Sequence, residues 1–273
     1  MAATTRTKSG TREAARPLAG RHALVTGGNR GIGAAIAERL AALGAGLTLL
    51  ARDQASLDEV AAKIASEHGG QIATAAADVT DPPALERAFE AARLANGEIS
   101  ILVNNAGAAT SAPFKRTDIE LWRDMIEVNL SSVFHCTRLA LPAMIEAGYG
   151  RIVNVASTAG LTGYAYVTAY CAAKHGVVGL TRALALEVAR SGVTVNAVCP
   201  GYTETDMTAR TLANIVAKTG CSEDEARAQL TAQSPQGRLI QPAEVASAVA
   251  WLVLAEQASI TGQTIAVAGG EIL

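Results

Sequence analysis

Residues 22–33 read His22-Ala23-Leu24-Val25-Thr26-Gly27-Gly28-Asn29-Arg30-Gly31-Ile32-Gly33. The first five form a short apolar run typical of a buried strand, and apolar residues recur at helical spacing after the glycines. Glycines let a backbone turn tightly and approach a pyrophosphate, and the start of a helix favours phosphate through its free N–H groups and dipole. The stretch therefore predicts a strand, a turn and a helix that bind a dinucleotide through Gly27, Asn29, Arg30, Gly31, Ile32 and Gly33. A glycine-rich turn without a ligand is the alternative, since the spacing is G-x-x-x-G-x-G rather than G-x-G-x-x-G.

Strand-like and helix-like segments alternate along the rest of the chain. The expected strands are 22–26, 47–51, 72–77, 101–104, 151–155, 193–198 and 264–267. The expected helices are 34–43, 54–67, 83–95, 119–147, 166–189 and 242–254. This alternation predicts an α/β fold, a Rossmann-like doubly wound parallel sheet of about seven strands in a single domain over 20–273. Ligands of such sheets bind at the carboxyl ends of the strands.

Two segments depart from this rhythm. Residues 1–19 are polar and basic, which predicts a disordered tail or a wrongly assigned start, with a transit peptide as the alternative. Residues 202–237 are polar and charged, and a segment of this length between packed elements is usually a lid over a binding site. Ser222 and Glu225 have the spacing of a capping box, so part of this lid is expected to be helical.

Composition limits the classes of function. The chain has 273 residues, of which 49% are hydrophobic, so it can bury a large core. The formal net charge of −2 argues against nucleic acid as a partner, and the apolar runs are too short to span a membrane. The four cysteines form no C-x-x-C pair and the four histidines show no metal-ligand spacing. We therefore expect free buried thiols, a reducing and hence cytoplasmic location, and no metal.

The end of the second strand bears on the choice of cofactor. Leu50-Ala51-Arg52-Asp53 places a basic residue where an acidic side chain would accept hydrogen bonds from the adenosine ribose. Arg30 in the glycine loop can approach the same corner, and two guanidinium groups suit a 2′-phosphate. The pattern favours NADP(H) over NAD(H). If Asp53 rather than Arg52 faces the ribose, the preference reverses.

The next two strands also end in residues that suit a dinucleotide. Asp78-Val79 follows the third strand, where a carboxylate can accept a hydrogen bond from the adenine amino group. Asn104-Asn105-Ala106-Gly107 closes the fourth, and its small residues allow a ligand to lie close to the backbone. We therefore expect Asp78, Val79, Asn105, Ala106 and Gly107 to contact the cofactor.

Tyr170 and Lys174 are four residues apart, with Ser157 thirteen residues upstream of Tyr170. On a helix, residues at i and i+4 lie on one face. An ammonium beside a phenol favours the phenolate, so we expect Lys174 to lower the pKa of Tyr170. Such a pair occurs by chance in many helices, and its weight depends on the other motifs.

In order and spacing, these motifs resemble those of the short-chain dehydrogenase/reductase family. The resemblance extends from about Leu18 to the C-terminus. It rests on the glycine loop, Asp78, Asn104–Gly107, Asn129, Ser157, the pair Tyr170 and Lys174, and Pro200-Gly201.

The resemblance implies a role for each residue. Ser157 would hydrogen-bond the substrate oxygen, Tyr170 would move the proton, and Lys174 would hold the nicotinamide ribose. Asn129 would hold a water that links Lys174 to solvent. Pro200 and Gly201, with Thr203 or Thr205, would hold the carboxamide. The resemblance also implies that the helices at 119–147 and 166–189 pair between subunits in a homotetramer or homodimer.

The substrate is less sharply indicated. The lid resembles those of 3-hydroxybutyrate dehydrogenases and of ketoreductases acting on 3-oxoacyl thioesters. The expected pocket wall consists of Ala159, Tyr164, Tyr166, Val167, Tyr202 and Met207. The favoured function is an NADP(H)-dependent reductase of 3-oxoacyl thioesters. The alternatives are an NAD-dependent secondary-alcohol or 3-hydroxybutyrate-type dehydrogenase, a sugar epimerase or dehydratase, and a dinucleotide-binding sensor or scaffold. A binding protein has no need of all four catalytic residues, which argues for an enzyme.

Overall fold

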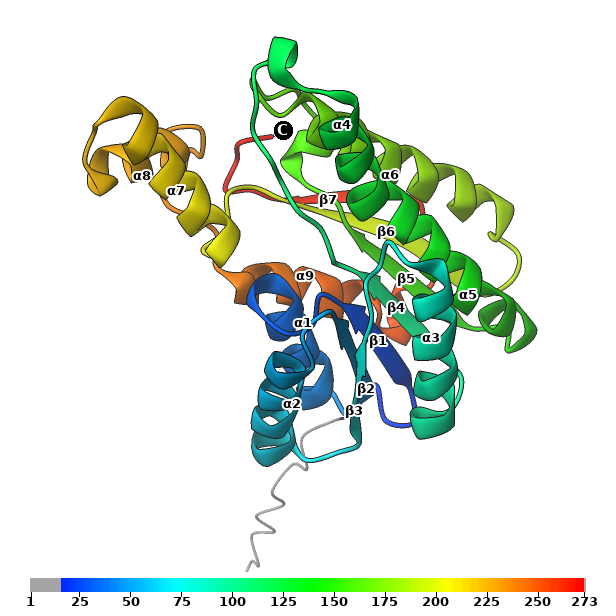
Figure 1. Cartoon of the computed structure of the whole chain (residues 1–273). Helices are drawn as coiled ribbons and strands as arrows, with labels where there is room; N and C mark the ends of the chain where they lie inside the picture. Colours follow the sequence, from blue (N-terminus) through cyan, green and yellow to red (C-terminus); the bar gives the residue numbers. More distant parts are fainter. Residues whose placement is uncertain (1–15, 273) are drawn as a thin grey trace, which may run out of the picture.

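The protein is described by a computed structural model over residues 16–272, in which seven strands form one parallel sheet (Figure 1). The strands are β1 (His22–Thr26), β2 (Gly46–Ala51), β3 (Ile72–Ala76), β4 (Ile101–Asn104), β5 (Gly150–Val155), β6 (Val193–Pro200) and β7 (Thr264–Val267). Their order in the sheet is β3-β2-β1-β4-β5-β6-β7, and every neighbouring pair is parallel. The predicted fold class is confirmed, and all predicted strand ends lie within two residues of the observed ones.

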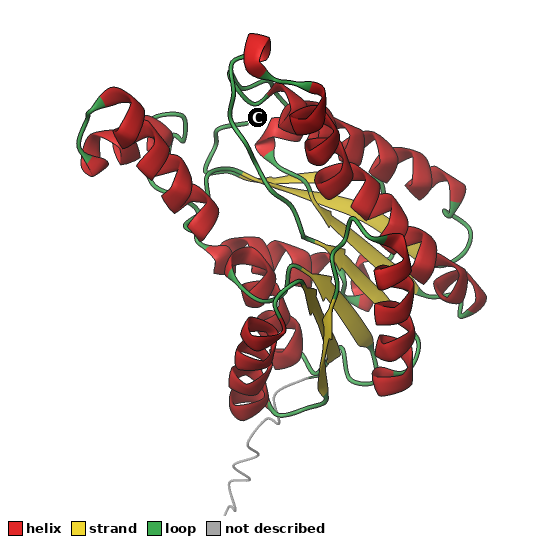
Figure 2. Cartoon of the chain, in the orientation of Figure 1, coloured by secondary structure: helices red, strands yellow, loops and turns green. Residues whose placement is uncertain are grey.

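The strands are apolar on both sides because helices cover both faces of the sheet (Figure 2). The helices are α1 (Gly31–Ala42), α2 (Gln54–His68), α3 (Pro82–Asn96), α4 (Ile119–Ile126), α5 (Ser132–Glu146), α6 (Thr168–Glu187), α7 (Asp206–Thr219), α8 (Glu223–Thr231) and α9 (Pro242–Leu252). Ile36, Leu57 and Val249 bury α1, α2 and α9 against one face. Phe89 and Met144 bury α3 and α5 against the other.

Helix starts follow local sequence signals. The side chains of Asp53, Asp81 and Asp118 each accept a hydrogen bond from a backbone N–H in the first turn of α2, α3 and α4. Ser222 and Glu225 form the capping box that the sequence predicted, and α8 begins there. These short-range contacts explain why the helix positions were readable from sequence.

The predicted helix 119–147 is not uniform. A π-helical turn at Glu127–Ser131 joins α4 to α5, and Asn129 is completely buried within it. One extra residue per turn shifts the side chains that follow, and such turns are often found at functional sites. The interruption changes the spacing of apolar residues too little to be recognised from one sequence.

The predicted tail, residues 1–19, includes residues that belong to the folded domain. Leu18 is buried, and its N–H donates to the carbonyl of Leu43 at 3.0 Å, so residues 16–19 belong to the folded domain. A single apolar residue in a basic stretch is too small a signal to reveal this contact. The rest of the predicted tail, 1–15, lies outside the described residues.

The sheet has a topological switch point beside β1. From β1 the chain proceeds outward through β2 to β3, and then returns to β4 on the other side of β1. The connections after β1 and β4 therefore lead to helices on opposite faces of the sheet, and ligands of such folds bind in the crevice at the carboxyl ends of these strands. Within residues 16–272, every helix is too short or too polar to cross a membrane.

Candidate active site

The glycine loop between β1 and α1 is held by the loop after β4. The Thr26 hydroxyl oxygen accepts hydrogen bonds from the N–H groups of Asn105 and Ala106, both at 3.0 Å. The Asn105 amide donates to the carbonyls of Thr26 and Gly27 at 2.9 and 3.2 Å. The Asn105 side chain is therefore used to fix the loop, and the backbone at Asn105 and Ala106 faces the same edge.

The first turn of α1 is open to an anion. Its N-cap, Arg30, makes no side-chain cap, and the first turn has no acidic residue, whereas five other helices are capped by a side-chain oxygen. Asn29 does not cap the helix either, since its amide donates to the Ser56 hydroxyl at 2.9 Å. Uncapped N–H groups at a helix start fit a phosphate. The predicted glycine loop thus has the conformation that a dinucleotide needs.

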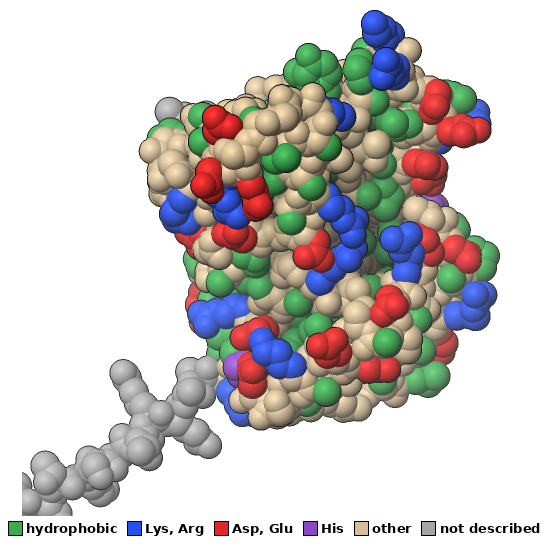
Figure 3. All heavy atoms as spheres, turned by 60° about the vertical axis from the view of Figure 1, so that its left-hand side comes forward, with side chains coloured by type: hydrophobic (Ala, Val, Ile, Leu, Met, Phe, Trp, Pro, Cys, Tyr) green, Lys and Arg blue, Asp and Glu red, His purple; other side chains and the backbone are tan. Residues whose placement is uncertain are grey.

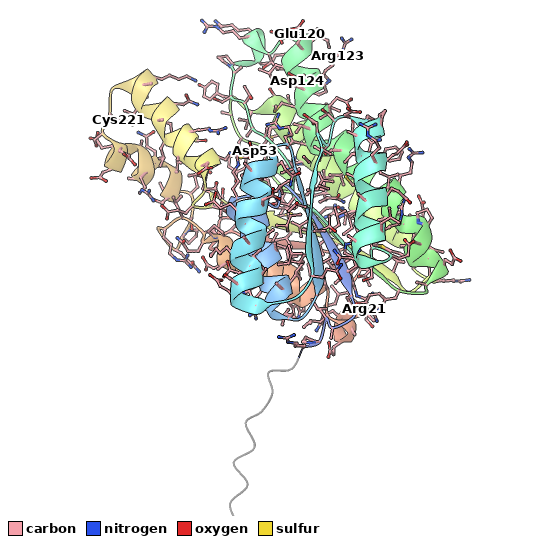
Figure 4. All side chains as sticks on the ribbon, turned by 60° about the horizontal axis from the view of Figure 1, so that its bottom comes forward. Arg21, Asp53, Glu120, Arg123, Asp124 and Cys221 are labelled. Carbon is pink, nitrogen blue, oxygen red and sulfur yellow. The ribbon has the colours of Figure 1, made fainter. Side chains whose placement is uncertain are left out.

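The adenosine corner is formed by Arg52 and Asp78 at the ends of β2 and β3. Their side chains form an exposed ion pair with an N–O distance of 3.8 Å. Asp53 lies at the start of α2 (Figure 4), where its carboxylate accepts from the Ser56 N–H at 2.7 Å. Asp53 is therefore engaged in capping, which supports the expectation that Arg52 faces the ribose. Arg30 instead pairs with Asp206 at 3.6 Å, at the start of α7.

Ser157, Tyr170 and Lys174 come together above the ends of β5 and β6. Lys174 is buried, and its ammonium donates to the Val155 carbonyl at 2.9 Å and lies 5.7 Å from the centre of the Tyr170 ring. The Ser157 hydroxyl accepts from the Ala159 N–H at 3.1 Å, and it is close enough to Tyr170 to lower the pKa of that phenol. Within residues 16–272 the Lys174 ammonium has one hydrogen-bond acceptor for its three protons, so it is able to hold a further oxygen.

The expected lowering of the Tyr170 pKa is wrong for the chain's own groups. Burial raises the pKa of Tyr170 to about 12, although the hydrogen bond from Ser157 opposes the rise. Burial also lowers the pKa of Lys174 to about 8. Desolvation disfavours the charged form of both groups and is the largest cause of both shifts.

The buried lysine should make stability depend on pH. A lysine whose pKa falls from 10.5 in the unfolded chain to about 8 in the folded one binds fewer protons when folded. Unfolding then becomes harder as the pH rises from about 8 to about 10.5, by up to about 1.4 kcal/mol per pH unit. We expect this slope in the unfolding free energy of the wild type relative to Lys174→Met, measured by urea denaturation. A difference that does not vary over this range would contradict the burial of a titrating ammonium.

Asn129 binds the loop after β4. Its amide donates to the carbonyls of Ala108 and Met125 at 2.9 and 3.0 Å, and its oxygen accepts from the Ala108 N–H at 3.2 Å. A Cβ on Gly107 would lie 2.7 Å from the Asn129 oxygen and 3.6 Å from the Lys174 nitrogen. Gly107 is therefore needed to keep the surface above Lys174 open, and the Asn129 side chain positions that loop.

The two candidate threonines in the turn after β6 make different contacts. Thr203 is buried, and its hydroxyl donates back to the Gly201 carbonyl at 3.0 Å. Thr205 caps α7, and its methyl carbon lies 3.3 Å from where a Cβ on Gly31 would be. Of the two, Thr205 is thus the one beside the glycine loop. Pro200 and Gly201 lie at the end of β6, at the same edge of the sheet.

The residues of the predicted pocket wall differ in their exposure. Tyr164 and Tyr202 are half-buried and pack edge to face, with ring centres 6.5 Å apart. Ala159 is only 3% exposed in the turn Thr158–Gly160, so it packs beneath the wall rather than lining it. Tyr166 has a φ of 68° and is 65% exposed, which turns it outward. Val167 is partly exposed at the start of α6, and Met207 is exposed on α7.

The lid consists of α7 and α8, which project from the body of the molecule (Figure 1). Leu212, Ala226 and Leu230 pack the two helices together in a small cluster of their own. Figure 3 shows a hollow in the middle of this side of the molecule, bordered by basic and hydrophobic side chains. The segment predicted as a lid is therefore helical, and its core is separate from the main core.

Two features of the site were missed by sequence reasoning. A buried chain of hydrogen bonds runs from Asn104 to Asn154 at 2.9 Å and from Asn154 to Thr181 on α6 at 2.9 Å. It fixes α6, and hence Tyr170, relative to β4 and β5. In the sequence, the signal for this chain of hydrogen bonds was limited to three polar residues within apolar segments, Asn104, Asn154 and Thr181. The second feature is Glu271, whose carboxylate accepts a hydrogen bond from the Tyr164 hydroxyl.

The cysteines and histidines outside the site carry no evident chemistry. All four cysteines are free, and Cys136 and Cys199 are buried, but Cys171 and Cys221 are partly exposed, contrary to prediction. Glu38, Glu67 and His68 bring ligand atoms within 4.8 Å of one another. The Lys63 ammonium lies 3.4 and 4.0 Å from the two carboxylates, which makes the group a surface ion-pair cluster.

The family of the chain follows from its similarity to known proteins. The family model described as short chain dehydrogenase matches residues 21–215. The chain belongs to the short chain dehydrogenase family. It is therefore an oxidoreductase acting on a carbonyl or alcohol group, as the resemblance predicted.

Several relatives of this short chain dehydrogenase are similar over nearly their whole length. A protein of Streptomyces violaceoruber, assigned as ketoacyl reductase 1 of the granaticin polyketide synthase, is 44% identical and covers 94% of this chain and 93% of its own. The 3-oxoacyl-(acyl-carrier-protein) reductase FabG of Escherichia coli K12 is 42% identical and covers 92% and 97%. A crystal structure of a variant actinorhodin polyketide ketoreductase with NADPH is 42% identical, covers 92% and 97%, and has a TM-score of 0.88.

Proposed function

We propose that this short chain dehydrogenase is an NADP(H)-dependent reductase of 3-oxoacyl thioesters, bound to coenzyme A or to a carrier protein. The observation that carries the proposal is the close placement of Ser157, Tyr170 and Lys174 beside Gly107, at the edge of the sheet where the glycine loop lies. The names of the relatives support the choice of substrate, since each denotes a ketoreductase or 3-oxoacyl reductase.

The chain's own residues suit such a cofactor. The uncapped start of α1 would receive the pyrophosphate, and Arg52 the 2′-phosphate. Lys174 would hold ribose oxygens with the protons that Val155 does not accept, and the turn at Pro200, Gly201 and Thr205 would hold the nicotinamide end. When bound, the cofactor supplies the hydride.

The protein residues handle the oxygen of the substrate. Negative charge grows on the carbonyl oxygen during reduction, so that oxygen needs a donor and a proton at one point. The Ser157 hydroxyl would donate a hydrogen bond to it, and the Tyr170 hydroxyl would give the proton. The pKa of Tyr170, raised to about 12 by burial, keeps the proton on the phenol until that charge develops. Lys174 then faces the phenolate and stabilises it.

The preference for NADP(H) should depend on Arg52. Arg52→Asp replaces the guanidinium with a carboxylate that repels a 2′-phosphate, while its ion pair with Asp78 is exposed and contributes little to stability. We expect the ratio of kcat/KM with NADPH to kcat/KM with NADH to fall by about 100-fold. This factor corresponds to the loss of about two charge-assisted hydrogen bonds. Arg39→Ala, at the opposite end of α1, is the matched control and should leave the ratio unchanged.

A substrate comparison tests the proposed reaction. Oxidation of NADPH should be followed with acetoacetyl and longer 3-oxoacyl thioesters, cyclic ketones and simple secondary ketones. The proposal requires the highest kcat/KM for a 3-oxoacyl thioester. A higher value for a cyclic or simple ketone, or a higher value with NADH than with NADPH, would contradict it.

We propose that the chain works as a homodimer or homotetramer in the cytoplasm. Phe134 and Ile145 on α5 and Leu186 on α6 are between 44% and 81% exposed, which favours a partner surface on these helices. The free thiols are consistent with a reducing compartment. Sedimentation of the purified protein tests the first statement, since a monomer at micromolar concentration would refute it, and cell fractionation tests the second.

A further inference from the structure

The C-terminal segment 268–272 borders the substrate side of the site. The Gly201 N–H donates to the Val267 carbonyl at 3.1 Å, and the Gln236 N–H donates to the Gly269 carbonyl at 3.3 Å. A Cβ on Gly269 would lie 2.5 Å from the Ser234 hydroxyl oxygen, so this contact with the end of the lid is tight. The segment is therefore fixed between the turn after β6 and the lid.

This placement directs the Glu271 carboxylate towards the site. One carboxylate oxygen accepts a hydrogen bond from the Tyr164 hydroxyl, and the other lies 2.6 Å from where a Cβ on Gly201 would be. Tyr164 is also hydrogen-bonded to the Thr158 hydroxyl at 2.9 Å, next to Ser157. The carboxylate is thus two hydrogen bonds away from the residue adjacent to the catalytic serine.

Tyr202 lies beside the tyrosine that donates to this carboxylate. Its ring packs edge to face against that of Tyr164, with the ring centres 6.5 Å apart, and Tyr202 follows Pro200 and Gly201 at the end of β6. In the proposed reaction, a substrate oxygen held by Ser157 and Tyr170 would place the neighbouring substrate atoms on the side of Tyr164 and Glu271, because Tyr164 contacts Thr158, the residue after Ser157.

The negative charge of Glu271 has no basic partner among residues 16–272, since no ion pair there includes it. It lines a cavity of about 470 Å³ together with Thr162, Gly163, Tyr164, Gln233 and Ile272, among others. The lining contains no lysine or arginine. The wall is therefore suited to a neutral group and opposes an anionic one.

We propose that Glu271 is a specificity-determining residue, which admits neutral 3-oxoacyl thioesters and repels free 3-oxo acids. The inference rests on the proposed function and names the substrate form that the site selects. In a 3-oxo acid the carboxylate is separated from the reacting carbonyl by one methylene carbon, so it enters the site with that carbonyl. In a thioester the same position carries no charge, and any phosphate group lies at the far end of the arm that joins the thioester to coenzyme A or to the carrier protein.

The test compares acetoacetate with its neutral N-acetylcysteamine thioester, each reduced with NADPH. The readout is the selectivity, the kcat/KM for the thioester divided by that for the free acid. In Glu271→Gln, which keeps an acceptor for Tyr164 but loses the charge, we expect the selectivity to fall at least tenfold, about 1.4 kcal/mol. Glu271→Asp keeps the charge and should retain most of the selectivity. Glu256→Gln, an exposed carboxylate in the turn Ala255–Gln257, is the matched control and should behave as the wild type.

The outcomes separate the two proposals. Unchanged selectivity in Glu271→Gln, or an equal fall in the Asp and Gln variants, would overturn the role of the charge while leaving the proposed reaction intact. A wild type that prefers acetoacetate to its thioester would also overturn the role of the charge. A wild type that reduces neither compound, but does reduce other ketones, would overturn the proposed function itself. Thermal unfolding of each variant shows whether a change in rate reflects loss of the fold.

Discussion

Tyr170→Phe is expected to lower kcat by about 1000-fold or more and to leave the affinity for NADPH within about twofold of the wild type. The substitution removes one oxygen atom, which is the proton donor in the proposed reaction. Ser157 and Lys174 remain, but the proton would then come from water, which is not held at the carbonyl oxygen. Steady-state rates with a 3-oxoacyl thioester and fluorescence titration with NADPH measure the two quantities.

Tyr149→Phe is the matched control for this substitution. It removes the same atom from a tyrosine that precedes β5, at the opposite end of the sheet, where the hydroxyl donates only a long hydrogen bond of 3.5 Å to Val253. Its kcat should equal that of the wild type. Retention of more than about a tenth of the wild-type kcat in Tyr170→Phe would show that another group supplies the proton.

Gly33→Ala is expected to destabilise the fold by about 3 kcal/mol and to weaken NADPH binding by at least about 100-fold. A Cβ at this position would lie 2.0 Å from the Gly27 carbonyl oxygen and 2.5 Å from the Asn105 amide nitrogen. Both atoms are held in place, because Asn105 donates to the carbonyls of Thr26 and Gly27. The loop must therefore open, which destroys the geometry proposed for the pyrophosphate. Urea denaturation and fluorescence titration measure the two effects.

Gly46→Ala is the corresponding control, at the first residue of β2. A Cβ there would have no neighbour closer than 3.6 Å, which is ordinary van der Waals contact. We expect its unfolding free energy to differ from that of the wild type by no more than about 0.5 kcal/mol. Equal effects of the two substitutions would mean that the close contact at Gly33 does not decide the outcome.

The predicted fold agrees with the structure because its signals are local. The strands could be predicted because short, mostly apolar runs reflect burial on both faces of a parallel sheet, as in β6, where every residue is buried. The start of α8 was readable because Ser222 and Glu225 cap it within one turn. Signals that depend on distant residues were weaker, and the contact of Leu18 with Leu43 and the π-helical turn at Glu127–Ser131 were both missed.

In the candidate site, too, local signals were recognised and contacts between distant residues were not. The sequence alone named Ser157, Tyr170 and Lys174, because their spacing is a local pattern. It did not reveal what each side chain contacts. Desolvation raises the pKa of Tyr170 where proximity to Lys174 was expected to lower it. Asn105 directs its amide to the backbone of the glycine loop, and Thr203 directs its hydroxyl to the backbone of its own turn.

Composition and local pattern therefore predicted the α/β fold, and the resemblance carried by the motifs predicted the family and the candidate residues for proton transfer. Only the tertiary structure decided the electrostatics of the site and the shape of the substrate wall. Solvent exposure and the approach of distant segments control both properties. Glu271 is the clearest example, because it lies more than a hundred residues from Tyr164 in sequence, yet accepts a hydrogen bond from it. No local pattern in the last few residues of the chain indicates that contact, since it forms only when the sheet brings the ends of β5, β6 and β7 together.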